Sequence, residues 1–334
     1  MLLVLMCGLF ACDRGEPAGA GKGTGGAGDG AEGGGGGSKP YTVVATVAMI
    51  ADIASAVAGE RATVSALIGQ GVDPHLYKPT STDVGKLMGA DVILYNGLLL
   101  EGRMTDALVR LASAGKKVHA VTELLEESEL LSPPGLAGHH DPHVWMDPLA
   151  WSKAVEVVRA KLTEFDPPGA GLYASNAKAY QERLTTLHEY CVTALATVPE
   201  KSRVLVTAHD AFNYMGRRYG YEVVGIQGLS TESEAGVRDI ENLVELLVSR
   251  DAKAVFVEST VSQRNIEALI AGCRARGHTV TIGGQLYSDA MGAAGTHEGT
   301  YVGMIDHNVT TIARALGGEA PERGMEGKLG GVGK

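Results

Sequence analysis

The sequence predicts an α/β protein of two lobes, each built on a four-stranded parallel sheet flanked by helices, with one long rigid helix joining them. Three observations predict this fold class. Short apolar runs rich in Val and Ile alternate with helical patterns from residue 41 onward, a long proline-free stretch of helical spacing follows, and the same alternation then resumes. Continuous apolar strands of this length are typical of parallel sheets that helices cover on both faces.

The N-terminal lobe is expected over residues 41–168. Its four strands are the apolar runs YTVVATV, ATVSALIG, DVILYNG and KKVHAV. The helical patterns between them are AMIADIASAVAG, TSTDVGKLMGA and MTDALVRLASAG, and a further helix is expected around residues 150–162. This order repeats the strand–helix–strand unit of parallel sheets.

The connecting helix is expected over residues 169–197. The sequence GAGLYASNAKAYQERLTTLHEYCVTAL contains no proline and keeps apolar residues at helical spacing, and prolines stand on both sides of it, in DPP before and at Pro199 after. Prolines in these places mark the two ends of a helix. A helix of about 25 residues is long for a globular protein, so we expect a rigid connection.

The C-terminal lobe is expected over residues 198–318, followed by a tail over residues 319–334. Its strands are RVLVTA, YEVVGIQG, AKAVFVEST and HTVTIGG. Its helices are DAFNYMGRRYG, VRDIENLVELLVSRD and QRNIEALIAGCRARG, and residues 301–317 have the pattern of a final amphipathic helix. The two lobes are therefore expected to be built alike.

Residues 1–12 are typical of a lipoprotein signal peptide. The run MLLVLMCGLFA is apolar but too short to span a bilayer, and the LFAC sequence that ends at Cys12 resembles a bacterial lipobox, whose cysteine becomes diacylated. An ordinary cleaved signal is the alternative. The Gly-rich residues 13–39 predict a flexible tether. We expect a cell-envelope protein that lipidated Cys12 anchors to the membrane, facing the periplasm or the cell exterior.

The composition limits the partners. The formal net charge of −10 argues against nucleic acid and is compatible with a cationic ligand. Cys191 and Cys273 lie far apart in helical patterns, which favours two buried small residues over a disulfide.

Metal-ligating residue types follow several of the predicted strands. His75 follows VSALIG, His209 follows RVLVTA, and Asp289 follows HTVTIGG. His143 lies in the loop GHHDPHVWMDP, before the helix around residues 150–162. Ligands of open parallel sheets bind at the carboxyl ends of the strands, so these residues converge if the two lobes face each other. Three imidazoles and one carboxylate suit zinc, or manganese, but spacing alone leaves ordinary loop residues as an equal alternative.

Nearby residues predict how the ligands are supported. Both His75 and His143 occur in an Asp-Pro-His sequence, where proline restrains the backbone and the aspartate can accept the second ring N–H. Glu258 lies at the end of the strand VFVEST, and we expect it to support a ligand or to stand at the entry of the next helix rather than to bind the ion. Thr231 and Glu234 have the spacing of a capping box that starts a helix.

Six sequence blocks carry a resemblance to a known family. They are DPHLYKPTSTDVGKLMGADVILYNGLLLEGRM, HVWMDP, TAHDAFNYMGRRYG, STESEAGVRDI, VFVESTVSQRNIEALI and LYSDAMGAAGTHEGTYVGMIDHN. In this order they resemble the zinc- and manganese-binding solute-binding proteins of metal ABC importers, the TroA-like group. The resemblance covers residues 41–317. It implies a metal in a cleft between two lobes, with His75, His143, His209 and Asp289 as its ligands.

The resemblance also implies a function without catalysis. A protein of this family captures one Zn²⁺ or Mn²⁺ ion and delivers it to an ABC importer permease and its ATPase, and we expect a monomer. Zinc-dedicated members often carry a long His-rich insertion, and here His139 and His140 are a short remnant of such a loop. Manganese-dedicated members often have Glu in place of His209. The metal therefore stays open between zinc and manganese, with the third imidazole favouring zinc.

Two other functions are compatible with the same residues. A zinc-dependent hydrolase could use a metal-bound water, although the sequence has no HExxH motif. A surface adhesin could hold the metal for structural reasons alone, in which case removal of the metal should unfold it.

Overall fold

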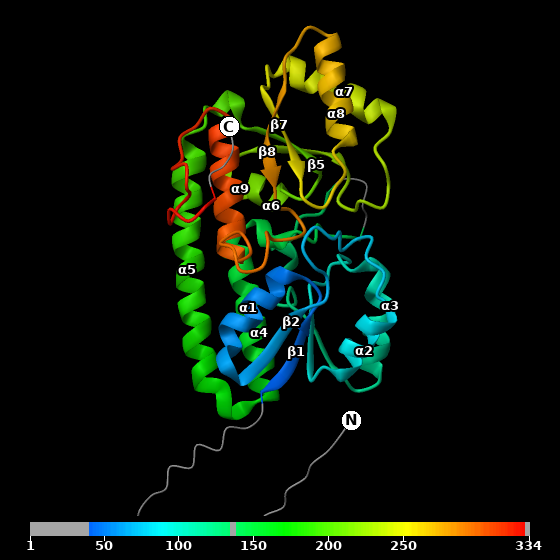
Figure 1. The fold of residues 1–334 in the computed structure, drawn as a ribbon, viewed down its shortest axis with the longest axis vertical. Coiled ribbons are helices and arrows are strands. Elements are labelled where there is room, and N and C mark those ends of the chain that lie inside the picture. The colour runs from blue at the N-terminus through cyan, green and yellow to red at the C-terminus, as the bar shows by residue number, and fades with distance from the viewer. Residues whose placement is uncertain (1–39, 134–137, 331–334) are drawn as a thin grey trace, which may run out of the picture. The chain divides into compact units, whose positions relative to one another are not determined.

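The computed structural model describes residues 40–133 and 138–330. In this part of the chain strands and helices follow one another in the predicted order, and the two-lobe α/β fold is confirmed (Figure 1). The signal over residues 1–12 with Cys12, the tether over residues 13–39 and the end of the tail lie outside the described residues.

The N-terminal lobe contains one parallel sheet, in the strand order β2-β1-β3-β4. The strands are β1 (Tyr41–Ala45), β2 (Ala62–Ala66), β3 (Val92–Tyr95) and β4 (Lys117–Ala120). The helices between them are α1 (Ala48–Ala58), α2 (Ser81–Gly89) and α3 (Thr105–Ser113). A capping box starts α2, because the Thr80 side chain accepts the Asp83 N–H while the Asp83 carboxylate accepts the Thr80 N–H.

Two long helices follow the first sheet. Helix α4 (Pro148–Phe165) begins with proline at its first position, and the Asp147 side chain accepts hydrogen bonds from its first free N–H groups. Helix α5 (Ala170–Ala196) is the predicted connecting helix. It runs beside α1, α4 and the last helix, α9 (Tyr301–Ala315), and so contacts elements from both ends of the chain (Figure 1).

The C-terminal lobe differs from the prediction in its strand pairing. Its strands are β5 (Val204–His209), β6 (Glu222–Gln227), β7 (Ala254–Glu258) and β8 (Thr281–Leu286). They form two hydrogen-bonded parallel pairs, β5-β6 and β7-β8, rather than one continuous four-stranded ladder. Strands β5 and β7 still pack against each other. The helices of this lobe are α6 (Asn213–Tyr219), α7 (Val237–Ser249) and α8 (Arg264–Ala275).

Apolar packing joins the two ends of the molecule. One buried cluster runs from the first sheet through α1, α4 and α5 to α9, and a second fills the space between β5–β8 and helices α7 and α8. Cys191 and Cys273 are buried and free, one in each cluster, as the sequence predicts. Of the helices in the described residues, none is both long and apolar enough to cross a membrane.

The predicted capping box at Thr231 and Glu234 is wrong. Helix α7 begins later, at Val237, where the Gly236 N–H donates to the Asp239 carboxylate. The Thr231 hydroxyl instead donates to Asp73, in the N-terminal lobe, at 2.5 Å. Thr231 and Glu234 have the spacing of a helix cap, but the Thr231 hydroxyl takes part in a tertiary contact instead.

Candidate metal centre

Four side chains from distant parts of the chain meet between the two lobes. His75 lies in the loop between β2 and α2, His143 in the loop before α4, His209 at the last position of β5, and Asp289 in the loop after β8. Each offers one ligand atom, and these four atoms lie within 4.8 Å of one another. The structure thus brings together the four residues that strand-end placement singles out.

The spacing of these atoms is that of a small coordination cage. The Nε2 atom of His143 lies 3.3 Å from that of His75 and 3.4 Å from that of His209. The same three nitrogens lie 3.2–3.5 Å from the nearer oxygen of Asp289. Ligand atoms about 3.3 Å apart are expected around a tetrahedral ion with bonds of about 2.0–2.1 Å. Both oxygens of Asp289 face the imidazoles, so the carboxylate can also bind an ion through two atoms.

The group is closed off from solvent. His143 and His209 are fully buried, and His75 and Asp289 are 4% and 1% exposed. Both carboxylate oxygens of Asp289 are buried without a hydrogen-bond partner. A buried carboxylate in this situation is costly unless a positive charge compensates it. Three imidazole nitrogens and this oxygen pair are the donor set of a divalent transition metal, so the residues fit such an ion.

His209 is held by a carboxylate behind it. Its Nδ1 lies 2.5 Å from Oε2 of Glu258, and its backbone N–H donates to Oε1 of the same residue at 2.8 Å. An ionised carboxylate can only accept hydrogen bonds, so Nδ1 carries a proton and Nε2 is the ring nitrogen that faces the other ligand atoms. Gly225 on β6 allows the neighbouring backbone to approach, since a Cβ there would lie 2.3 Å from the Asp210 nitrogen.

His143 is held in the same manner. Its Nδ1 lies 2.7 Å from Oδ1 of Asp141, which also accepts the His143 backbone N–H at 2.9 Å. Asn213, in α6, donates to the other oxygen of Asp141 at 3.1 Å. His75 is supported differently, because Asp73 accepts its backbone N–H at 2.8 Å and not a ring N–H. The second Asp-Pro-His sequence therefore fixes the loop rather than the imidazole.

The loop that carries His143 is fixed to the C-terminal lobe on several sides. The Trp145 indole donates to the Ser288 carbonyl at 2.8 Å, directly before Asp289. Tyr301 in α9 donates to the Trp145 carbonyl at 2.7 Å, and Arg218 in α6 pairs with Asp147 at 2.7 Å. One further hydrogen bond, from Asn96 to the Pro142 carbonyl at 3.0 Å, reaches the N-terminal lobe.

Burial and the neighbouring carboxylates shift the pKa values of the histidines in this group in opposite directions. Burial alone lowers the pKa of His143, but Asp141 and Asp289 outweigh it and raise that pKa to about 9. Burial also lowers the pKa of His209, but Glu258 and Asp289 outweigh it and raise that pKa well above its usual value. The ion-free group therefore holds protons on two imidazoles at neutral pH.

His75 and Asp289 shift in the opposite direction. Burial lowers the pKa of His75 to about 4, because it outweighs the attraction of Asp289. Burial would raise the pKa of Asp289, but the neighbouring His209 and His143 lower it well below its usual value. At neutral pH His75 is thus ready to bind an ion without losing a proton, and Asp289 is ionised.

A cavity of about 580 Å³ opens beside the group. His75 lines its inner end, and Leu98, Leu99, His139 and His140 are among the residues around it. His140 is hydrogen-bonded to Ser132 at 2.9 Å rather than directed at the four residues. His139 is exposed. The two extra histidines of the loop therefore lie at the approach to the group and not in it.

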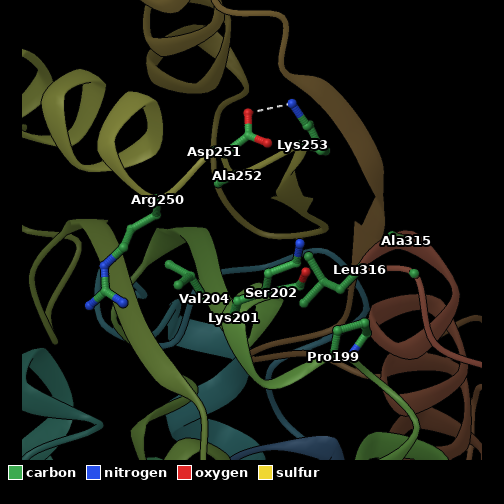
Figure 2. Close-up of a pocket in the computed structure, with 11 residues that line it drawn as sticks. Pro199, Lys201, Ser202, Val204, Arg250, Asp251, Ala252, Lys253, Ala315 and Leu316 are labelled. Atoms are coloured by element: carbon green, nitrogen blue, oxygen red, sulfur yellow. Dashed lines mark hydrogen bonds and ion pairs between the residues drawn. The ribbon is translucent and has the colours of Figure 1, made fainter.

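A separate pocket of about 270 Å³ lies at the other end of the C-terminal lobe strands, where β5 and β7 begin (Figure 2). Figure 2 shows the ion pair of Asp251 and Lys253 on one side of the pocket and Pro199 and Leu316 across from it. Arg250, which also lines it, pairs with Glu222. None of the four residues of the candidate metal centre lines this pocket.

Comparison with known proteins gives consistent matches. The model of the ZnuA family, described as zinc-uptake complex component A, periplasmic, matches residues 43–315. Over 274 residues the chain is 50% identical to the manganese-binding lipoprotein MntA of Bacillus subtilis, covering 82% of this chain and 89% of MntA. It is 45% identical over 274 residues to the zinc-binding protein TroA of Treponema pallidum, covering 82% and 88% of the two chains. The solved TroA structure matches with a TM-score of 0.81 and covers 83% of this chain and 99% of TroA.

Proposed function

Because this chain belongs to the ZnuA family of zinc-uptake components, we propose that it captures one zinc or manganese ion outside the cytoplasmic membrane and delivers it to an ABC importer. Its partners are the importer's permease and ATPase. The observation that carries the proposal is the buried group of three imidazoles and one carboxylate, whose atoms lie within 4.8 Å of one another.

The four residues act as the ligands in this proposal. His75, His143 and His209 bind the ion through Nε2, and Asp289 binds it through one or both oxygens. Asp141 and Glu258 orient two of the rings from outside. The three imidazoles favour zinc over manganese, whereas a bidentate Asp289 adds the oxygen that manganese prefers. The family relatives divide in the same way, since MntA is named for manganese and TroA for zinc.

The cellular location that we propose rests on the N-terminal sequence and on the relatives. MntA of Bacillus subtilis is a lipoprotein by name, and so is the metal-binding FimA of Streptococcus parasanguinis. We place this protein in the cell envelope, attached through a diacylated Cys12 and a Gly-rich tether, as a monomer that reaches the permease by reorienting on that tether. Loss of membrane association in Cys12→Ser would support the attachment.

Catalysis is not part of this proposal. The hydrolase alternative needs a free base near the ion, and the two outer carboxylates are already engaged, Glu258 with His209 and Asp141 with His143. Four protein ligands also leave no open position at a tetrahedral ion for a reactive water. The ZnuA-family relatives likewise act as binding proteins.

Equilibrium dialysis of the chelator-stripped protein tests the proposal. One equivalent of Zn²⁺ or Mn²⁺ should remain bound after dialysis, and competition between the two ions should rank them, with Zn²⁺ ahead. Absence of stoichiometric binding for both ions would overturn the proposed function.

A further inference from the structure

Three of the four proposed ligands are fixed by the surrounding structure. His209 lies on strand β5 with Glu258 behind it. His143 has Asp141 behind it, in a loop bonded to α6 and α9. The Asp289 loop is held through the hydrogen bond between the Trp145 indole and the Ser288 carbonyl. These three ligands are therefore held in place by the protein itself.

His75 has a different setting. It lies in a loop whose neighbouring side chains Val72 and Leu76 are 37% and 43% exposed. Its backbone N–H is bonded to Asp73, at 2.8 Å. Because α5 packs against elements from both ends of the chain, a wide rotation of the lobes is disfavoured, and a loop of this kind can move without one.

The Asp73 carboxylate connects this loop to the other lobe. One of its oxygens accepts the His75 N–H, and the other accepts the Thr231 hydroxyl at 2.5 Å. Thr231 lies in the loop before α7 and is 8% exposed. A second contact of the Thr231 loop with the N-terminal lobe joins Glu232 to Arg103, in the 3₁₀ turn before α3, at 2.9 Å. It is open to solvent and therefore contributes little.

Cavities on two sides give the His75 loop room to move. The cavity of about 580 Å³ is lined by His75 and by Leu229 and Ser230 of the Thr231 loop. Another, of about 300 Å³, is lined by Asp73, Leu76 and Thr231. The hydrogen bond between Asp73 and Thr231 therefore joins two loops that both line these cavities.

We propose that this hydrogen bond is the latch that holds His75 against the other three ligands, and that its opening sets the rate at which the ion leaves. Asp73 and Thr231 are positioning residues, since they act on the ion through His75. The inference rests on the function proposed above. It implies that His75 binds last during capture and withdraws first during release, while His143, His209 and Asp289 stay in place.

Removal of the Thr231 hydroxyl tests the latch. Thr231→Val keeps the shape of the side chain. The ion's dissociation rate, measured by stopped flow with excess chelator, should rise about 10- to 100-fold because the half-buried Asp73 carboxyl loses its donor. The association rate should change little. Thr231→Ser keeps a hydroxyl and should restore slow dissociation. Asp73→Asn is a second variant that weakens the same contact, and it should also dissociate faster.

Two further measurements separate the latch from a general loss of structure. Arg103→Gln breaks the exposed contact that joins the Thr231 loop to the turn before α3, and it should leave the dissociation rate within about twofold of the wild type. In the ion-free protein, hydrogen exchange of the amides at residues 73–77 should accelerate in Thr231→Val, while the melting temperature stays close to that of the wild type.

The outcomes for the latch and for the proposed function are distinguishable. If the wild type binds an ion tightly and Thr231→Val releases it at the wild-type rate, the latch is wrong and the proposed function stands. If the wild type itself binds neither Zn²⁺ nor Mn²⁺, the proposed function fails, and the latch with it. Equal acceleration in Arg103→Gln and Thr231→Val would also overturn the latch, because any contact between the Thr231 loop and the N-terminal lobe would then suffice.

Discussion

The ring of His209 and the carboxylate of Glu258 form a closed pair, with Nδ1 2.5 Å from Oε2 and the His209 backbone N–H 2.8 Å from Oε1. This double contact fixes both the position and the tautomer of the ring. Pairs of this kind recur in metal sites, where the outer carboxylate orients the ligand and increases its basicity. The first prediction follows from this pair.

Glu258→Gln should weaken binding of the ion by about 10- to 100-fold, because the ring loses a charged acceptor while Nε2 stays available. Competitive titration against a chelator of known affinity measures the change. Glu267→Gln, at an exposed position on α8, is the matched control and should bind like the wild type. An unchanged affinity in Glu258→Gln would show that the pair does not support the ligand.

His143→Ala and His209→Ala should each lower the affinity by more than the roughly 10- to 100-fold expected for loss of an outer contact. The ion-free protein should keep its fold, because the apolar clusters do not include these rings. Its melting temperature should fall, because Asp141 or Glu258 loses its buried partner. His140→Ala is the control within the same loop, because His140 is bonded to Ser132 and not directed at the group. Wild-type affinity in both ligand variants would refute the site.

Binding of the ion should release about two protons at pH 7, because His143 and His209 hold protons in the ion-free group and His75 does not. The pKa of His143 is raised to about 9, so protons compete with the ion below that pH and the affinity falls as the pH falls. Calorimetry in buffers of different ionisation enthalpy counts the protons. Binding that releases none would mean that the two imidazoles are already neutral.

Removal of the ion should lower the melting temperature without unfolding the protein. At a free ion concentration about 1,000 times the dissociation constant, binding stabilises the fold by about 4 kcal/mol, or roughly 10 °C for a chain of this size. Thermal scans with and without a strong chelator measure the shift, and circular dichroism follows the fold at 25 °C. Unfolding upon chelation would instead favour the adhesin alternative with a structural ion.

Much of this architecture could be predicted from local sequence. The strands are continuous apolar runs, and the prolines around α5 mark its limits to within two or three residues. The placement of His75, His209 and Asp289 after strands was enough to suggest that they meet. Glu258 could be anticipated as well, because it ends β7, beside β5 with His209 at its end.

Other features depend on contacts that the sequence does not display. The spacing of Thr231 and Glu234 was that of a helix cap, but the Thr231 hydroxyl bonds to Asp73, which lies 158 residues away. The two Asp-Pro-His sequences look alike, yet one aspartate binds a ring and the other a backbone N–H. The separate ladders of β5-β6 and β7-β8 likewise follow from the packing of whole elements and not from any one strand.

The unbroken course of α5 has a consequence for selectivity. A helix of 27 residues is a rod about 40 Å long, and it shares packed surfaces with elements from both ends of the chain. The elements packed on this helix therefore shift little when ions of different radius bind. Ions of similar size are then hard to tell apart by fit alone, so the ranking of zinc and manganese has to come from the chemistry of the donors, three imidazoles and one carboxylate.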